Sequence, residues 1–346
     1  MQISEGVTDR QFRVLAAVIQ IYVETAEPAG SQAVTHRSRL GISPASVRTA
    51  MSELEAKGLL FHAHTSGGRI PTDRGYRLYV NQLLPGGPVP ERARARLESE
   101  IAPASRSAID EILRRAAQIL GVLTQELGVA IAPALDQLVL ERLELVRVSS
   151  ERLLAVLTLQ SRLVRTIFVE IPAAVAPEAV DNVSRILNER LGGLALREIR
   201  VSLPERLRDA GGADEGRELL NIFVAQGEEL FDLSDDESTV VLGSAQPLAE
   251  QPEFASNERM RHLLDLTERR DLLRRAFEEH HRRGLRLTIG SENSDPRLAE
   301  FTLVTSAYRS GSLSGVIGVL GPTRMPYEKI IGLVEHTSRM VEGLME

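Results

Sequence analysis

The sequence contains no cysteine and no tryptophan, and aromatic residues make up only 4% of it. The absence of cysteine excludes disulfides, thiolate metal centres and a cysteine nucleophile, and it suits a reducing compartment. No uncharged apolar run is long enough to span a bilayer, and the first ten residues, MQISEGVTDR, lack the basic start and apolar stretch of a signal peptide. The sequence therefore predicts a cytoplasmic protein that does not enter a membrane.

The chain is acidic as a whole but not at its start. The net charge is −7 over 346 residues, a length that predicts more than one domain. Residues 1–84 contain nine Lys and Arg against seven Asp and Glu, whereas the remainder contains 32 against 41. A basic segment on an acidic body is the pattern expected when one module faces phosphate and the other faces water or protein.

The first segment predicts three helices in close succession. A capping box and apolar residues at helical spacing indicate a helix over 8–23. A short second helix over 31–40 ends at Gly41, and a third begins at Ser43 as its N-cap and closes at Gly58. Two helices joined by a tight turn that contains glycine are typical of a helix-turn-helix.

The third helix has one apolar and one polar face. Its packing face comprises Val47, Ala50, Met51 and Leu54. A helix that lies in the major groove needs small hydrogen-bonding side chains and a long cation on its outer face. The candidate DNA contacts on that face are Ser43, Ser46, Arg48, Thr49 and Ser52.

A short hairpin follows the third helix. An apolar run at 59–61, a Ser-Gly-Gly turn and a return strand from Arg69 predict two strands, the wing of a winged helix-turn-helix. The glycines let the backbone approach DNA closely. The wing supplies the candidate contacts His64, Thr65, Ser66 and Arg69.

A fourth helix is predicted from its N-cap, Thr72. It carries two further candidate DNA contacts, Arg74 and Arg77, and offers Tyr76 and Tyr79 for packing. The two arginines equally fit a solvated helix face, so the pattern leaves both interpretations open.

Several of these stretches together resemble the HrcA family of heat-inducible transcription repressors. The most specific match is HTSGGRIPTDRGYRLYVNQLL at 64–84, preceded by EPAGSQAV at 27–34 and SPASVRTAMSELEAKGLL at 43–60. SRLVRTIFVEIP at 161–172 and GVIGVLGPTRMPYEKIIGLVEHTS at 315–338 extend the resemblance over essentially the whole chain.

The resemblance implies an α+β multidomain architecture. Its parts are a winged-helix DNA-binding domain at 1–84, a linker at 85–104, a GAF-like domain formed by 105–171 and 255–346, and an inserted dimerisation domain at 172–254. The residues support the outline, because strand-like runs lie on both sides of a helix-rich middle. Prolines and glycines at the start of the linker also favour a break between domains.

The resemblance also implies a function. A member of this family represses chaperone genes by binding an inverted-repeat operator in double-stranded DNA as a homodimer, and the GroEL chaperonin maintains its active state. No cofactor or metal is implied. The chain departs from the family pattern at Thr49, where the family usually has Asn, and at Ala63, where Pro is frequent.

Other interpretations stay open from the residues alone. A protein-interaction scaffold would use the winged helix without DNA. A ligand-responsive repressor of metabolic genes would use a pocket near the glycines Gly311, Gly315, Gly318 and Gly321, which equally fit tight turns.

Metal and catalytic sites have weaker support. His62 and His64 alternate on one strand but lack a third ligand nearby, and the adjacent residues of Glu278–His281 point in different directions on a helix. The sequence shows no phosphate loop, no His-Glu-x-x-His motif and no Ser, His, Asp order typical of hydrolases. The sequence therefore favours a binding protein over an enzyme.

Overall fold

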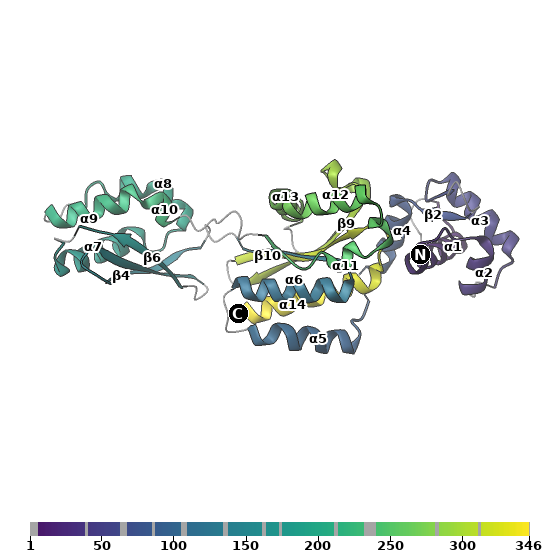
Figure 1. Cartoon of the computed structure of the whole chain (residues 1–346), viewed down its shortest axis with the longest axis horizontal. Coiled ribbons are helices and arrows are strands. Elements are labelled where there is room, and N and C mark those ends of the chain that lie inside the picture. The colour runs from purple at the N-terminus through teal and green to yellow at the C-terminus, as the bar shows by residue number, and fades with distance from the viewer. Residues whose placement is uncertain are drawn as a thin grey trace. The chain divides into compact units, whose positions relative to one another are not determined.

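The computed structural model divides the chain into two compact units (Figure 1). Unit 1 comprises residues 1–131, 240–308 and 316–344, and unit 2 comprises mainly 132–239 with 309–315. The structure describes residues 6–38, 41–62, 68–84, 87–104, 109–133, 138–160, 164–172, 175–210, 214–231, 240–280, 284–310 and 313–345. Within these ranges, no helix is both long enough and apolar enough to cross a membrane.

Residues 6–84 of unit 1, called the head below, contain four helices and a two-stranded antiparallel sheet. The elements are α1 (Asp9–Thr25), α2 (Ser31–Ser38), α3 (Pro44–Ala56), β1 (Leu60–His62), β2 (Arg69–Pro71) and α4 (Asp73–Leu83). The sheet pairs Leu60 with Pro71 and His62 with Arg69. The predicted helices, the hairpin and the order of these elements are confirmed.

Local capping explains where the head helices begin and end. Thr8 forms the predicted capping box with Gln11, and the Ser43 hydroxyl accepts a hydrogen bond from the Ser46 N–H at 3.2 Å. Gly58 follows the C-cap of α3 with φ of +70°, the left-handed conformation that ends a helix at little cost for glycine, and Gly41 before α3 also has a positive φ of +67°. These signals involve only neighbouring residues, so the sequence alone was sufficient to predict them.

The rest of unit 1, called the body, is built on a five-stranded sheet of order β7-β3-β10-β9-β8. The strands are β3 (Leu127–Ile131), β7 (Val240–Leu242), β8 (Leu285–Ile289), β9 (Phe301–Ser310) and β10 (Leu313–Pro322). Helices α6 (Ile109–Thr124) and α14 (Tyr327–Met345) lie on one face, and α12 (Asn257–Glu268) and α13 (Arg270–Glu278) lie on the other (Figure 1). Because helices cover both faces, strand β3 is buried at all five positions.

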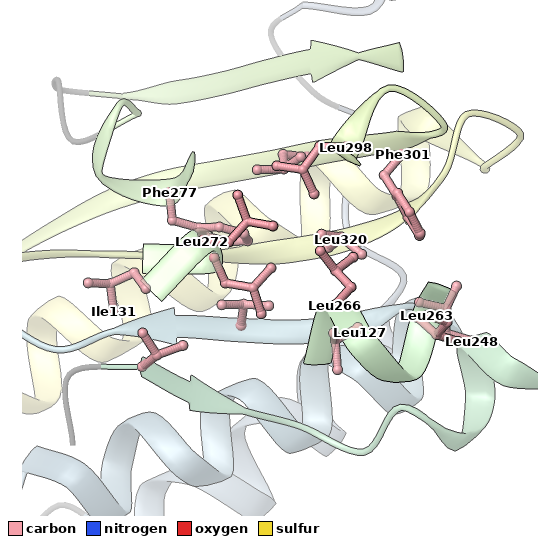
Figure 2. Close-up of a cluster of buried hydrophobic side chains, with 14 of the residues drawn as sticks. Leu127, Ile131, Leu248, Leu263, Leu266, Leu272, Phe277, Leu298, Phe301 and Leu320 are labelled. Atoms are coloured by element: carbon pink, nitrogen blue, oxygen red, sulfur yellow. The ribbon is translucent and has the colours of Figure 1, made fainter. Parts of the chain in front are cut away.

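The space between this sheet and α12 and α13 is filled by apolar side chains (Figure 2). Leu127, Ile131 and Leu320 from the sheet meet Leu266 and Phe277 from the helices, and each of these side chains is at most 2% exposed. This packed cluster forms a hydrophobic core between the sheet and the two helices.

The predicted bounds of the linker and of the inserted segment are wrong. Most of the expected linker at 85–104 is helix α5 (Glu91–Ile101), whose Ala93, Leu97 and Ile101 are buried as α5 packs against α6. Apolar residues at helical spacing outweigh the breaking effect of the prolines that precede them.

The inserted segment also begins and ends earlier than the expected 172–254. The strands assigned to the GAF-like sheet, β4 (Leu140–Arg147), β5 (Arg152–Leu159) and β6 (Val164–Glu170), form a separate three-stranded sheet in unit 2. Helices α7 (Pro177–Leu191), α8 (Leu196–Leu207), α9 (Asp214–Ala225) and α10 (Gly227–Leu230) complete that unit. Each strand pairs with its neighbour in sequence, and local pairing of this kind does not require the body sheet.

The three-stranded sheet of unit 2 has one open face. Val146 and Phe168 are 47% and 56% exposed, and both lie in one cross-strand row with Leu154. Val148 and Val164 are each 55% exposed. Residues of the opposite parity, such as Leu153, Leu157 and Val169, are buried. The apolar residues on this open face therefore form an exposed hydrophobic patch, a feature typical of an interaction surface.

Helix α4 joins the head to the body within unit 1. Asp73 accepts hydrogen bonds at 2.9 Å from both the backbone N–H and the hydroxyl of Ser291. The guanidinium of Arg77 donates to the Glu292 carboxylate and, at 2.7 Å, to the Leu287 carbonyl. These contacts connect the head to the turn after strand β8.

We expect Gly128→Ala to destabilise the body strongly. A Cβ atom at Gly128 would lie 1.9 Å from the Ala117 carbonyl oxygen, so strand β3 and helix α6 would have to separate. The cost is about 1 to 3 kcal/mol of unfolding free energy or more. Gly343→Ala on α14 is the control, because nothing lies within 4 Å of its added Cβ. Urea unfolding followed by circular dichroism measures both, and equal midpoints would contradict the packing described.

Candidate nucleic-acid interface

The outer face of α3 carries polar side chains that point to solvent. Arg48, Thr49 and Ser52 are exposed, whereas Val47 and Leu54 on the inner face are fully buried. The amphipathic pattern of α3 thus fixes which side is available to a partner. A long cation with small hydroxyl side chains beside it can approach base edges and donate or accept hydrogen bonds there.

The serines and the threonine of α3 also make local hydrogen bonds. Ser43 caps the helix and its hydroxyl lies 3.1 Å from that of Ser46. The Thr49 hydroxyl donates to the Ala45 carbonyl at 3.2 Å. A hydroxyl keeps two acceptor lone pairs when it donates, so Thr49 can still accept a hydrogen bond from a base or from water.

A hollow of about 420 Å³ lies beside α3. It is lined by Gly30, Ser31, Gln32, Arg48, Met51, His62 and Arg69. The N-terminus of α2 presents the positive end of its dipole to this hollow, and Arg48 adds a positive charge. The hollow therefore combines two features that favour an anion such as a phosphate.

Arg69 is held in place by the head itself. Its Nε donates to Glu55 at 2.8 Å, and its side chain is only 15% exposed. Its backbone N–H and carbonyl exchange hydrogen bonds with Ala29 at 3.0 and 2.9 Å. Arg69 thus ties the hairpin to α3 and to the segment before α2, and it also lines the hollow.

The two arginines of α4 lie in different surroundings. Arg74 is exposed and lies near Gly58, whose added Cβ would be 3.4 Å from the Arg74 guanidinium. Arg77 instead points into the body, where Glu292 and the Leu287 carbonyl bind it. The Nε and Nη2 donors of Arg77 are thus used within unit 1, and the DNA contact expected of this residue stays a prediction.

Three candidates of the wing, His64, Thr65 and Ser66, lie outside the described residues. The structure adds residues that pattern reasoning missed. Gly30, Ser31 and Gln32 line the hollow, and the guanidinium of Arg10 on α1 donates to the Ser46 carbonyl at 3.4 Å. The predicted start of the second helix at residue 31 was the signal in the sequence for Ser31 and Gln32.

The other candidate sites do not assemble in the described residues. His64 and His281 lie outside them, and no group of three His, Asp or Glu side chains in the described part is placed to hold a metal ion. His280 is buried with its Nδ1 2.9 Å from the Thr305 hydroxyl, and burial lowers the pKa of its imidazole. This environment favours a neutral histidine that packs in the body.

Two of the four glycines proposed for a ligand pocket have close neighbours. A Cβ at Gly318 would lie 2.2 Å from the Val304 carbonyl oxygen, and one at Gly321 would lie 2.0 Å from the carboxylate of Glu126. Gly311 lies outside the described residues. Gly318 and Gly321 thus permit close packing of strand β10 against its surroundings.

Comparison with known proteins gives consistent matches. A family model described as "HrcA protein C terminal domain" matches residues 110–331. Heat-inducible transcription repressors HrcA are 37% identical over 339 residues in Chlorobium phaeobacteroides (strain BS1), covering 95% of this chain and 96% of that protein, and 37% identical in Chlorobium luteolum, covering 94% of both. A crystal structure described as that of a hypothetical protein covers 98% of both chains with a TM-score of 0.63 and 22% identity, which supports the fold.

We expect Arg48→Ala to lower affinity for a specific duplex more than for a scrambled one. If the guanidinium makes a bidentate contact to a guanine, the difference is about 1 to 3 kcal/mol. Fluorescence anisotropy titrations with both duplexes measure it. Arg92→Ala removes an exposed arginine from α5 of the body and serves as the control. An equal loss on both duplexes would show that Arg48 contacts only phosphate.

Proposed function

This chain belongs to the HrcA family of heat-inducible transcription repressors, and we propose that it represses chaperone genes by binding an inverted-repeat operator as a homodimer. Two regions carry the proposal: the exposed polar face of α3 and the cationic hollow beside it. In this proposal the GroEL chaperonin maintains the active state. The protein acts in the cytoplasm, where bacterial promoters are located.

The head would bind as a winged helix-turn-helix. In this arrangement α3 enters the major groove, and Arg48, Thr49 and Ser52 face the base edges. A backbone phosphate next to the groove occupies the hollow, where the N-terminus of α2 attracts its charge. The hairpin of β1 and β2 is the wing. Arg74 supplies a more distant contact to the backbone.

The body would be GAF-like and serve as the carrier of the head. Its sheet order, numbered along the body strands alone, is 2-1-5-4-3, with helices on both faces. The apolar cluster under α12 and α13 fills the space on that side of the sheet. This packing favours a scaffold over a pocket for a ligand between the sheet and those helices.

Homodimer formation would cover the open sheet face of unit 2. The row formed by Val146, Leu154 and Phe168 crosses all three strands, and Arg152 stacks on the Phe168 ring at 4.8 Å. A two-fold axis that places two such faces together buries apolar surface on both protomers at once. Two heads carried by one dimer then match the two half-sites of an inverted repeat.

The chaperonin link fits the connectivity of the chain. Unit 1 assembles from three separate segments, because 132–239 and 309–315 interrupt it. Strand β3 ends at Ile131 and β10 begins at Leu313, so β3 cannot pair with β10 until the 181 residues between them (312 − 131) have been made. Pairing over such separations is slow and exposes apolar surface. Heat-damaged proteins that occupy the chaperonin would then leave less folded repressor.

Footprinting tests the function and the chaperonin link together. The purified chain should protect an inverted repeat upstream of the chaperonin genes of its own genome. Chain diluted from denaturant with GroEL, GroES and ATP should yield a larger active fraction than chain diluted alone. No protection even with chaperonin would refute operator binding, whereas equal fractions would refute only the chaperonin link.

We expect Phe168→Glu to produce monomers, because two buried carboxylates would face each other across the proposed interface. Sedimentation velocity measures the association state, and a gel shift should show loss of binding to the full repeat. Val201→Glu is the matched control, since Val201 is 81% exposed on α8, away from the open sheet face. A Phe168→Glu protein that stays dimeric would place the dimer contacts elsewhere.

A further inference from the structure

A second hollow lies at the junction of the head and the body, within unit 1. Its volume is about 460 Å³, in the range of about 300 to 1,000 Å³ that is usual for small-molecule sites. The head contributes α1, the hairpin and the start of α4. The body contributes η4 (Pro252–Phe254), α12 and the loops at the ends of β9 and β10.

One side of this hollow is apolar and rich in rings. Its apolar lining residues are Phe61, Ile70, Pro71, Phe254, Phe301 and Pro322. Phe61 is 46% exposed although it belongs to a strand of the head. Phe254 and Phe301 stack with ring centroids 6.0 Å apart. Such walls fit a flat aromatic ring.

The other side gathers hydrogen-bond donors. Tyr76 is 1% exposed, and its hydroxyl has no hydrogen-bond partner among the described residues. Tyr22, Arg324 and Glu253 are its electrostatic neighbours and line the same hollow. Burial is the main cause that raises the pKa of Tyr76 and of Tyr22, so both remain protonated donors at neutral pH. A buried hydroxyl without a partner has lost its hydrogen bonds to water, and a ligand can restore them.

The lining at this end also offers donors to an anionic group. The Glu253 carboxylate accepts from Arg324 at 2.5 and 2.9 Å, so these two charges cancel. Arg259, which donates to the Glu253 carbonyl at 3.4 Å, adds a second guanidinium to the lining. Of the other lining acids, Asp73 already accepts from Ser291 and Glu300 is exposed to solvent.

We propose that this hollow binds a small aromatic carboxylic acid. The ring packs against the apolar wall, and the carboxylate accepts hydrogen bonds from the Tyr76 hydroxyl and the Arg259 guanidinium. The occupant touches the head and the body at once, so its affinity depends on how the two are arranged. This site is distinct from the cationic hollow beside α3 and does not depend on the proposed operator binding.

Titration calorimetry with phenylacetate, benzoate and 4-hydroxybenzoate tests the proposal. At least one should bind with an affinity of about millimolar or better, as expected for ligands of this size. Neutral phenylacetamide should bind less tightly than phenylacetate. Both Tyr76→Phe and Arg259→Gln should weaken carboxylate binding about tenfold, the loss expected for one charge-assisted hydrogen bond.

A control variant and a melting temperature test whether the effect of Tyr76→Phe comes from the hollow. Tyr308→Phe is the matched control, because the Tyr308 hydroxyl is buried but donates to the Ile131 carbonyl away from the hollow. Without ligand, Tyr76→Phe should melt at the same temperature as the original chain or higher, since it removes an unpaired hydroxyl. No saturable binding of any of the three acids, or equal binding by the Tyr76 and Arg259 variants and the original chain, would overturn the proposal.

Discussion

The attachment of α4 to the turn after β8 is the constraint on which the rest depends. Arg77 binds Glu292 and the Leu287 carbonyl, and Asp73 binds Ser291 one residue earlier in the same turn. Both side chains lie on one face of α4, since they are four residues apart. In the proposed function, a head that must match half-sites at a fixed spacing needs a stiff connection to the body. Helix α4 supplies this connection through Asp73 and Arg77.

The parts of the fold that the sequence predicted are those governed by near neighbours. Thr8, Ser43 and Thr72 cap helices through bonds to residues three positions away, and Gly58 ends α3 through its own φ. The role of Arg77 was not predictable in this way, because its partner is 215 residues distant in the chain. The assignment of β4, β5 and β6 failed for a related reason. Alternating apolar residues define a strand but do not say which sheet it joins.

Fewer arginines of the head are available to bind an anion than the sequence suggested. Of the candidate cations, Arg77 is committed to the body and Arg69 is paired with Glu55, so Arg48 is the exposed arginine on the outer face of α3. The helix dipole of α2 compensates in part for the smaller number of available arginines, since backbone N–H groups bind phosphate without adding net charge. An acidic chain can therefore present a cationic surface where it needs one and repel DNA elsewhere.

The head and the body share the hollow around Tyr76, so an occupant of this hollow contacts both of them. Burying a hydroxyl without a partner costs free energy, and an occupant that accepts its hydrogen bond removes this cost. The Glu253–Arg324 pair at the same junction is also mostly buried and adds a bond from Arg324 to the Val23 carbonyl of α1 at 2.7 Å. Polar groups from α1, α4 and the body therefore meet at one place. Any occupant that pairs with them changes the free energy of holding the head in position, and through it the spacing of the two heads in the proposed dimer.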